Sequence, residues 1–314
     1  MKKPTDRAHL LRIAGTLLAI ALLIYLLSRQ GWQSILDATR QIPLGILAAC
    51  FGLVLVSRLA VALRWHVLLR ASGLAIPLWQ TVQITFAGLF ASNFLPTTVG
   101  GDVVRLAGAV RLKHDSAAVT ASLIADRLVG MAGMALTVPF GLPAFLGSLH
   151  QAGGAWLPGF SLAALTYSAK GGVAWDSLKS KISRFMAHLA QSLKVYLKRP
   201  TSLLAALLFS GLHMACIFTV LYLLFKYEGQ SIGWGLVAGL NSLVYFITLL
   251  PVSINGYGLQ ELSMTLIYSR AGGVSLESSL SVALLLRTLM LLASLPGSLT
   301  ISTILAGTRN DEVK

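Results

Sequence analysis

Two short segments of the sequence share a residue pattern that could bind an anion inside a membrane. Each contains a proline, then a glycine-bearing polar turn, then an acidic residue. The first segment, residues 92–105, contributes Asn93, Pro96, Gly100, Gly101, Asp102 and Arg105. The second segment, residues 249–261, contributes Pro251, Asn255, Gly256, Gly258 and Glu261. Glycine permits close backbone approach and hinge motion, and a helix that starts after such a turn offers free N–H groups to a phosphate.

Each segment is followed by an apolar stretch that carries an arginine, Arg127 in the first case and Arg287 in the second. A charge at the centre of a bilayer costs at least about 2.5 kcal/mol, so such residues persist when they are paired or functional. We therefore expect the two guanidinium groups to hold a phosphate or another anion. Asp102, Asp126 and Glu261 would pair with the arginines or bind a cationic amine of a head group. The alternative is an internal ion pair with a structural role only.

Arg58 and Arg105 could add positive charge to the same site. Arg58 lies one to two turns from the end of its apolar stretch, and Arg64 follows it. The alternative for Arg58 and Arg64 is that their side chains extend along the helix to the lipid head groups.

The two segments are separated by about 155 to 160 residues, and we interpret them as two copies of one repeated unit. From the expected directions of the helices that carry Arg127 and Arg287, the repeat would be inverted. Paired Pro/Gly-interrupted segments in matching halves indicate the binding site of a transporter, and interrupted backbone at membrane depth must face protein or a water-filled cavity. The alternative is that Pro96 and Pro251 simply end helices at loops.

The elements that must position these residues are transmembrane helices. Of the 314 residues, 55% are hydrophobic and only 11% are charged, whereas a soluble domain carries roughly 25% charged residues. This composition excludes a cytosolic enzyme, a disordered chain and a disulfide-stapled secreted module. We predict an all-α, polytopic transmembrane helix bundle of six to eight spans with two re-entrant segments. The expected spans are residues 13–28, 41–63, 116–149 (ended by Pro139 and Pro143), 200–225, 231–250 and 280–307, with weaker segments at 156–169 and 259–268.

The net charge of +14 is concentrated in short stretches between the apolar runs. By the positive-inside rule, we place the N-terminus and the loop 170–199 in the cytoplasm and the protein in the inner (plasma) membrane. We predict that residues 170–199 form a basic amphipathic helix on anionic inner-leaflet lipid, between a first half, 1–169, and a second half, 200–314. The alternative is a solvated linker helix. The same charge pattern argues against nucleic acid as a partner.

The sequence contains no metal, nucleotide or nucleophile motif, so we expect no cofactor and no metal site. Cys50 and Cys216 lie within apolar runs and are expected to be inert packing residues. His213, in the middle of an apolar stretch, is expected to be a packed, hydrogen-bonded histidine. Without an ATP-binding motif, any transport would be downhill or ion-coupled.

These motifs resemble a known family. The Gly100–Asp102 segment, the Asp126–Arg127 helix, the Gly256–Glu261 segment and the late Arg287 look like the lysylphosphatidylglycerol synthase/flippase transmembrane family, and the resemblance covers nearly the whole chain. It implies a helical membrane domain with re-entrant segments that moves lipid between leaflets. Some stand-alone members are associated with hopanoid or glycan-lipid pathways.

The resemblance favours a lipid flippase for a phospholipid, a hopanoid or a polyprenyl- or glycan-linked lipid. Because the sequence shows no soluble domain after the membrane part, we expect no aminoacyl-transferase activity. Two alternatives remain open. One is a membrane enzyme that modifies lipid with Asp102 or Glu261 as acid–base. The other is a scaffold that recruits a lipid or glycan biosynthesis enzyme through residues 170–199.

Overall fold

The computed structural model describes residues 40, 42–93, 95, 100–151, 196, 199–249 and 258–300. All regular secondary structure in these ranges is helical, which confirms the predicted all-α fold. Four helical segments there are long and apolar enough to cross a bilayer: Leu44–Ala71, Ser116–Phe140, Pro200–Tyr227 and Leu276–Thr300. The predicted segments 13–28, 156–169 and most of 170–199 lie outside the described residues.

The described helices form two units with the same order of lengths, which confirms the predicted repeat. In each unit a long helix is followed by two short helices and then by another long one. The first unit consists of α3 (Leu44–Ala71), α4 (Leu78–Ser92), α5 (Gly100–Arg111) and α6 (Ser116–Thr137). The second consists of α10 (Pro200–Tyr227), α11 (Trp234–Thr248), α12 (Leu259–Ala271) and α13 (Leu276–Ser294).

The turn that ends the first long helix is also repeated. Gly73 after α3 has φ 83° and Gly229 after α10 has φ 75°, a conformation that glycine adopts without the clash of a Cβ atom. Corresponding helices begin about 155 to 160 positions apart, in agreement with the spacing of the two sequence segments.

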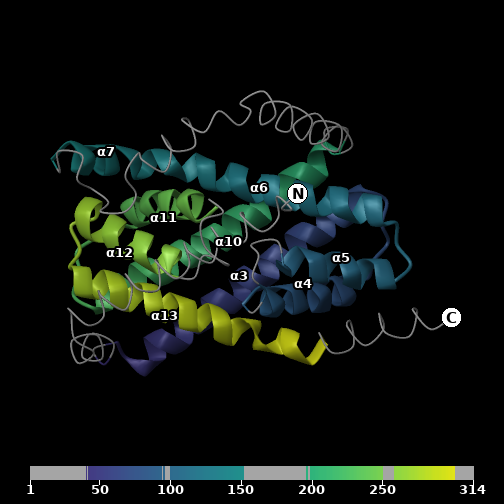
Figure 1. Cartoon of the computed structure of the whole chain (residues 1–314), viewed down its shortest axis with the longest axis horizontal. Coiled ribbons are helices and arrows are strands. Elements are labelled where there is room, and N and C mark those ends of the chain that lie inside the picture. The colour runs from purple at the N-terminus through teal and green to yellow at the C-terminus, as the bar shows by residue number, and fades with distance from the viewer. Residues whose placement is uncertain are drawn as a thin grey trace, which may run out of the picture.

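Corresponding helices run in opposite directions. In Figure 1, α6 runs leftward to α7 (Leu142–Gln151), whereas α13 runs rightward to the C-terminal trace. The contacts between the two units are also reciprocal. The first long helices, α3 and α10, pack on each other. The last long helix of each unit, α6 or α13, packs on the first long helix and on the first short helix of the other unit. These features are those of an inverted repeat with a pseudo-two-fold axis.

A 3-10 turn follows the last helix of each unit and packs on the other unit. Turn η1 (Val138–Phe140) contacts α11, and η2 (Leu295–Gly297) contacts α4. A Cβ atom on Gly141 would lie 2.5 Å from the carbonyl carbon of Gly239, so the backbones meet there because both residues are glycine. The third span is shorter than the predicted 116–149, since α6 stops at Thr137 and η1 contains Pro139. Pro143 lies in the first turn of α7 and does not end the span.

Both predicted interruptions separate a pair of short helices. The first falls between α4 and α5, and the second between α11 and α12. Helices α4 and α5 have 15 and 12 residues, and helices α11 and α12 have 15 and 13 residues. A helix needs about 20 residues to span the bilayer, so each of these is too short to cross alone. The expectation of a full span at 231–250 is therefore wrong in length, and re-entrant entry of the pairs remains a prediction. Four residues assigned to the interruptions, Pro96, Pro251, Asn255 and Gly256, lie outside the described residues.

Close contact between α4 and α5 depends on glycine. A Cβ atom on Gly101 would lie 2.7 Å from the carbonyl oxygen of Gly88, and a Cβ atom on Gly88 would meet the carbonyl oxygen of Gly101 at the same distance. The two helices can therefore pack backbone to backbone. The start of α5, which carries Asp102 and Arg105, also packs against the long helix α6.

Candidate functional site

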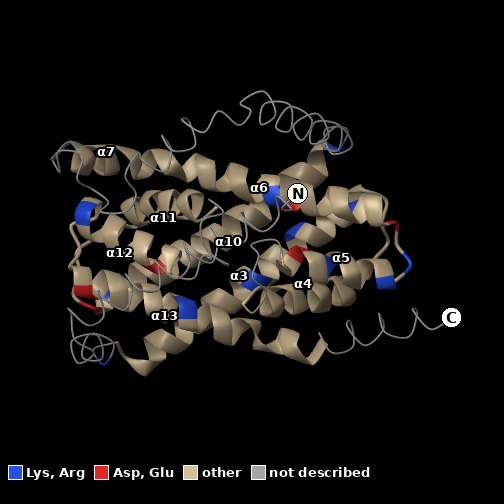
Figure 2. Cartoon of the chain, viewed as in Figure 1, with Lys and Arg blue, Asp and Glu red and all other residues tan. Residues whose placement is uncertain are grey.

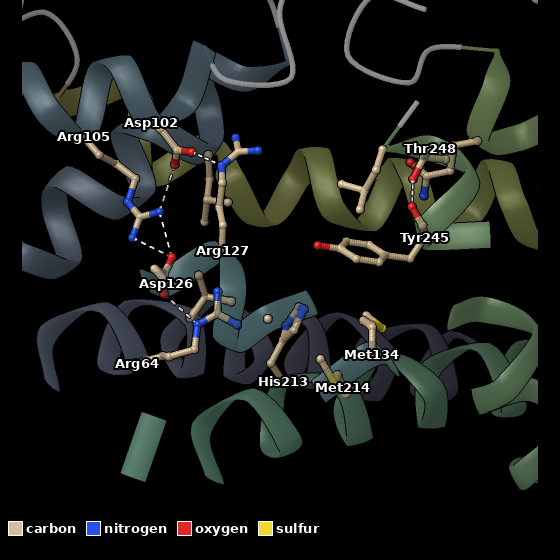
Figure 3. Close-up of a pocket in the computed structure, with 15 residues that line it drawn as sticks. Arg64, Asp102, Arg105, Asp126, Arg127, Met134, His213, Met214, Tyr245 and Thr248 are labelled. Carbon is tan, nitrogen blue, oxygen red and sulfur yellow. Dashed lines mark hydrogen bonds and ion pairs between the residues drawn. The ribbon is translucent and has the colours of Figure 1, made fainter. Parts of the chain in front are cut away.

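A cavity of about 390 Å³ lies between the two units. The first unit lines it with Val61, Arg64, Leu89, Asp102, Arg105, Asp126, Arg127, Gly130 and Met134. The second unit lines it with His213, Met214, Tyr245, Thr248, Leu249 and Gln260. The charged side chains gather on one wall, and the second unit contributes neutral polar and apolar groups (Figure 3). This volume is within the range of small-molecule binding sites.

Asp126 is the centre of the charged wall. Its side chain is 3% exposed. The Arg64 Nε donates to its Oδ1 at 2.7 Å, and both terminal nitrogens of Arg105 donate to its Oδ2 at 3.1 Å. Because Arg64 and Arg105 come from α3 and α5 while Asp126 belongs to α6, the carboxylate joins three helices of the first unit.

Asp102 connects this buried centre to the open part of the cavity. Its Oδ1 accepts from Arg105 Nη1 at 3.1 Å, and its Oδ2 accepts from Arg127 Nε. The Arg127 side chain is 40% exposed and extends to the cavity (Figure 3). Arg127 is therefore the guanidinium of the cluster that a ligand in the cavity can reach most readily.

Neighbouring side chains hold the two buried arginines in place. The Arg105 guanidinium lies 4.2 Å from the centre of the Trp65 ring, and the Trp65 indole N–H donates to Ser122 Oγ at 3.1 Å. Arg64 Nη1 donates to Ser210 Oγ at 3.2 Å. A Cβ atom on Gly130 would lie 3.1 Å from Arg64 Nη1, so this glycine leaves room for the guanidinium.

The cluster carries one net positive charge, because three arginines face two aspartates. Figure 2 shows charged residues at the ends of the bundle and a further group within it, beside α3, α5 and α6. Coulomb interactions are stronger in a partly buried site than in water. The site can thus accept one unit of negative charge, and a guanidinium matches the geometry of phosphate and carboxylate oxygens.

Comparison with known protein families shows which family the chain belongs to. The model of the family described as the lysylphosphatidylglycerol synthase TM region matches residues 12–297, a range that contains both units and every residue that lines the cavity. The chain belongs to the lysylphosphatidylglycerol synthase transmembrane family. A search of curated proteins found no match. Membership of this family indicates a membrane protein with a function related to membrane lipid.

The second unit of this lysylphosphatidylglycerol synthase TM region contains a counterpart of the Asp102–Arg127 pair. Arg287 Nε lies 2.6 Å from Glu261 Oε1, on the two helices that correspond to α6 and α5. Glu261 Oε2 also accepts from the backbone N–H of Gly258 at 2.9 Å, at the start of α12. Gln260 lines the cavity and accepts from Arg287 Nη1 at 3.5 Å, so this second pair lies directly behind the cavity wall.

The rest of the charged cluster has no counterpart in the second unit. The positions that correspond to Arg64, Arg105 and Asp126 are occupied by apolar residues that belong to one buried core cluster. They are Val220, Met264 and Leu286. The repeat is therefore symmetric in its backbone and asymmetric in its chemistry, with the anion-binding groups concentrated in the first unit.

Several residues predicted from the sequence do not line this cavity. Arg58 lies half-buried on α3, and its Nε atom has no hydrogen-bond partner among the described residues. The Asn93 amide donates to the carbonyls of Leu89 and Phe90 at 3.2 Å and to Ser294 Oγ at 2.9 Å, so it connects the end of α4 to α13.

Other residues that line the cavity were not predicted. Arg64 is buried and paired with Asp126, so the alternative in which its side chain extends to the head groups does not hold for Arg64. The signal that could have revealed it is the apolar content that continues beyond it to Ala71, where α3 ends. His213 lies on the cavity wall and shares a hydrogen bond of 2.6 Å with Ser57 Oγ, which confirms the expected hydrogen-bonded histidine. Among the described residues, no group of three or more His, Cys, Asp or Glu side chains could hold a metal ion.

Proposed function

We propose that this protein moves an anionic lipid between the leaflets of a membrane. In this proposal the lipid head group passes through the cavity between the two units while the acyl chains stay in the bilayer. The observation that supports this proposal is the cavity between the two units, whose wall in the first unit is positively charged. The protein belongs to a membrane family with a lipid-related function. A lipid phosphodiester carries one negative charge and would neutralise the surplus charge of the cluster.

The geometry divides the charged residues into two roles. Asp126 holds the guanidinium groups of Arg64 and Arg105, and all three are buried. Arg127 is the most exposed cation of the cluster, and we assign to it the contact with the phosphate. Tyr245 and Gln260 face the same space from the second unit and could bond to hydroxyl or amine groups of the head group.

Movement would come from one unit rocking against the other. Inverted repeats support this motion in other transporters, because the two packings related by the pseudo-two-fold axis open the site to opposite sides. One hinge would be Gly258 at the start of α12, where φ is 75°. With no ATP-binding motif in the sequence, the driving force would be a lipid gradient or a coupled ion.

We further propose that the protein lies in the inner membrane with its N-terminus and the 170–199 loop in the cytoplasm. The basic residues of that loop would bind anionic lipid of the inner leaflet. Enzymes of lipid or glycan synthesis are the proposed protein partners. The proposal assigns transport rather than catalysis to the protein.

The experiment is leaflet exchange of head-group-labelled phospholipid in liposomes that contain the purified protein. We expect Arg127→Gln to reduce the exchange rate at least about tenfold, because one charge-assisted contact to phosphate is lost. The matched control is Arg70→Gln, which removes an exposed arginine that does not line the cavity and should leave the rate unchanged. Normal exchange by a folded Arg127→Gln protein would overturn the site, and conversion of the lipid without exchange would overturn transport in favour of a membrane enzyme.

A further inference from the structure

A third buried acidic group, after Asp126 and Glu261, lies at the far end of α10, outside the cavity. Glu228 follows the last residue of α10 and is 6% exposed. Its Oε1 accepts from Ser281 Oγ of α13 at 2.6 Å. Its Oε2 is buried and has no hydrogen-bond partner among the described residues. The carboxyl group thus lies between α10 and α13, beside the side chains of Ser281 and Ser278.

This carboxyl group has no cationic partner among the described residues. The charged residues at the adjoining helix ends are Lys226 on α10, Arg270 on α12, Glu277 on α13 and Arg40 just before α3, and all four are exposed. Glu228 also lies at the C-terminal end of α10, where the helix dipole disfavours a negative charge. A buried carboxylate without a cation is costly, and burial raises the pKa of the Glu228 carboxyl to about 7.

The first unit shows that the fold does not require a carboxyl group at this position. The corresponding residue is Ser72, which follows α3 and precedes Gly73 as Glu228 precedes Gly229. Ser72 Oγ shares a hydrogen bond of 2.6 Å with the Tyr196 hydroxyl. A neutral hydroxyl therefore completes the same turn, and the buried acid is specific to the second unit.

We infer that Glu228 is a proton-binding site that couples the packing of α10 against α13 to pH. When protonated, the side chain is neutral and keeps its hydrogen bond to Ser281. When the proton leaves, an uncompensated charge is buried between the helices and weakens their contact. The inference goes beyond lipid transport and does not depend on it.

The site can influence the cavity through the two helices that it joins. α10 carries His213 and Met214 on the cavity wall, and α13 carries Arg287, which bonds to Gln260. On the orientation that the sequence predicts, α10 begins at the cytoplasmic face and ends at the opposite face. The proton would then be exchanged with the external solution.

The first test is thermal unfolding of the purified full chain between pH 5 and pH 8. Because the pKa of Glu228 is raised in the folded state, the folded state holds an extra proton between pH 4.5 and about 7. Its contribution to stability is full at the low-pH end of this window and is lost as pH rises through about 7. The melting temperature of the unaltered protein should fall across this range by roughly 5 °C more than that of Glu228→Gln.

The matched control is Glu277→Gln, which removes an exposed carboxylate from the first turn of α13 and should follow the unaltered protein. A Glu228→Gln protein whose melting temperature follows the unaltered protein at every pH would overturn the inference. Should Glu228→Gln fail to fold, infrared spectroscopy of the unaltered protein decides the question. We expect a protonated-carboxyl band that titrates near pH 7, and its absence would overturn the inference whether or not the protein moves lipid.

Discussion

Substitution of Asp126 by Asn removes the negative charge shared by two buried guanidinium groups. The Asp126 side chain is 3% exposed and that of Arg64 is 9% exposed, so solvent does not screen the pair appreciably. The amide of Asn keeps the shape of the carboxylate and can still accept one or two hydrogen bonds. It leaves Arg64 without an anion and leaves Arg105 with Asp102 alone.

The expected cost follows from these contacts. Removing one partner of a buried ion pair costs about 3–5 kcal/mol, because the other charge remains buried without compensation. Asp102 retains part of the compensation for Arg105, so we expect about 3 kcal/mol, the lower end of that range, for Asp126→Asn. The assay is equilibrium unfolding of the purified protein in detergent or lipid.

The matched control is Asp115→Asn on the same helix. Asp115 is exposed and caps α6 by accepting from the Ala118 N–H at 2.8 Å, and Asn caps a helix nearly as well as Asp. We expect a change of less than about 0.5 kcal/mol for it. A loss below about 1 kcal/mol for Asp126→Asn would refute the reasoning, since it would show that the two guanidinium groups reach water or another anion without Asp126.

Two glycine substitutions test the backbone of the interrupted segments, both by equilibrium unfolding. Gly101→Ala adds a Cβ atom 2.7 Å from the Gly88 carbonyl oxygen and forces α4 and α5 apart, so we expect a loss of about 1–3 kcal/mol; an unchanged stability would show that the helices separate freely. Gly258→Ala places a side chain at φ 75° and should cost about 1–2 kcal/mol; a gain in stability would contradict the left-handed start of α12.

The sequence allowed a pairing of Asp102, Asp126 and Glu261 with the arginines to be predicted in general terms, but not which acid pairs with which arginine. Asp102 and Arg127 stand out because both carry a local signal. Each lies in or beside an apolar stretch, where a lone charge is costly, and each has a counterpart in the second half, Glu261 and Arg287. The repeat could be predicted for the same reason, since proline, glycine and acid recur in the same order.

The rest of the site could not be predicted because it depends on contacts between distant helices. The Arg64–Asp126 contact joins residues 62 positions apart. Arg64 lies just beyond the predicted span 41–63, whereas α3 continues to Ala71. The apolar residues that replace the cluster in the second unit, Val220, Met264 and Leu286, also could not be identified by aligning only the two short segments. They become evident only when whole helices are matched between the two units.

The most direct test of the central claim is the accessibility of the cavity to water within the membrane. The two native cysteines, Cys50 and Cys216, are buried, so a single introduced cysteine can be followed in liposomes with a charged thiol reagent. Thr248→Cys lies on the cavity wall, whereas Leu208→Cys replaces a side chain on the outer surface of α10 that is 67% exposed. We predict that Thr248→Cys reacts, that phosphodiester lipid slows its reaction, and that Leu208→Cys does not react because hydrocarbon surrounds it. An unreactive Thr248→Cys in a folded protein, or a reaction rate that anionic lipid leaves unchanged, would contradict a wet, head-group-binding cavity between the two units.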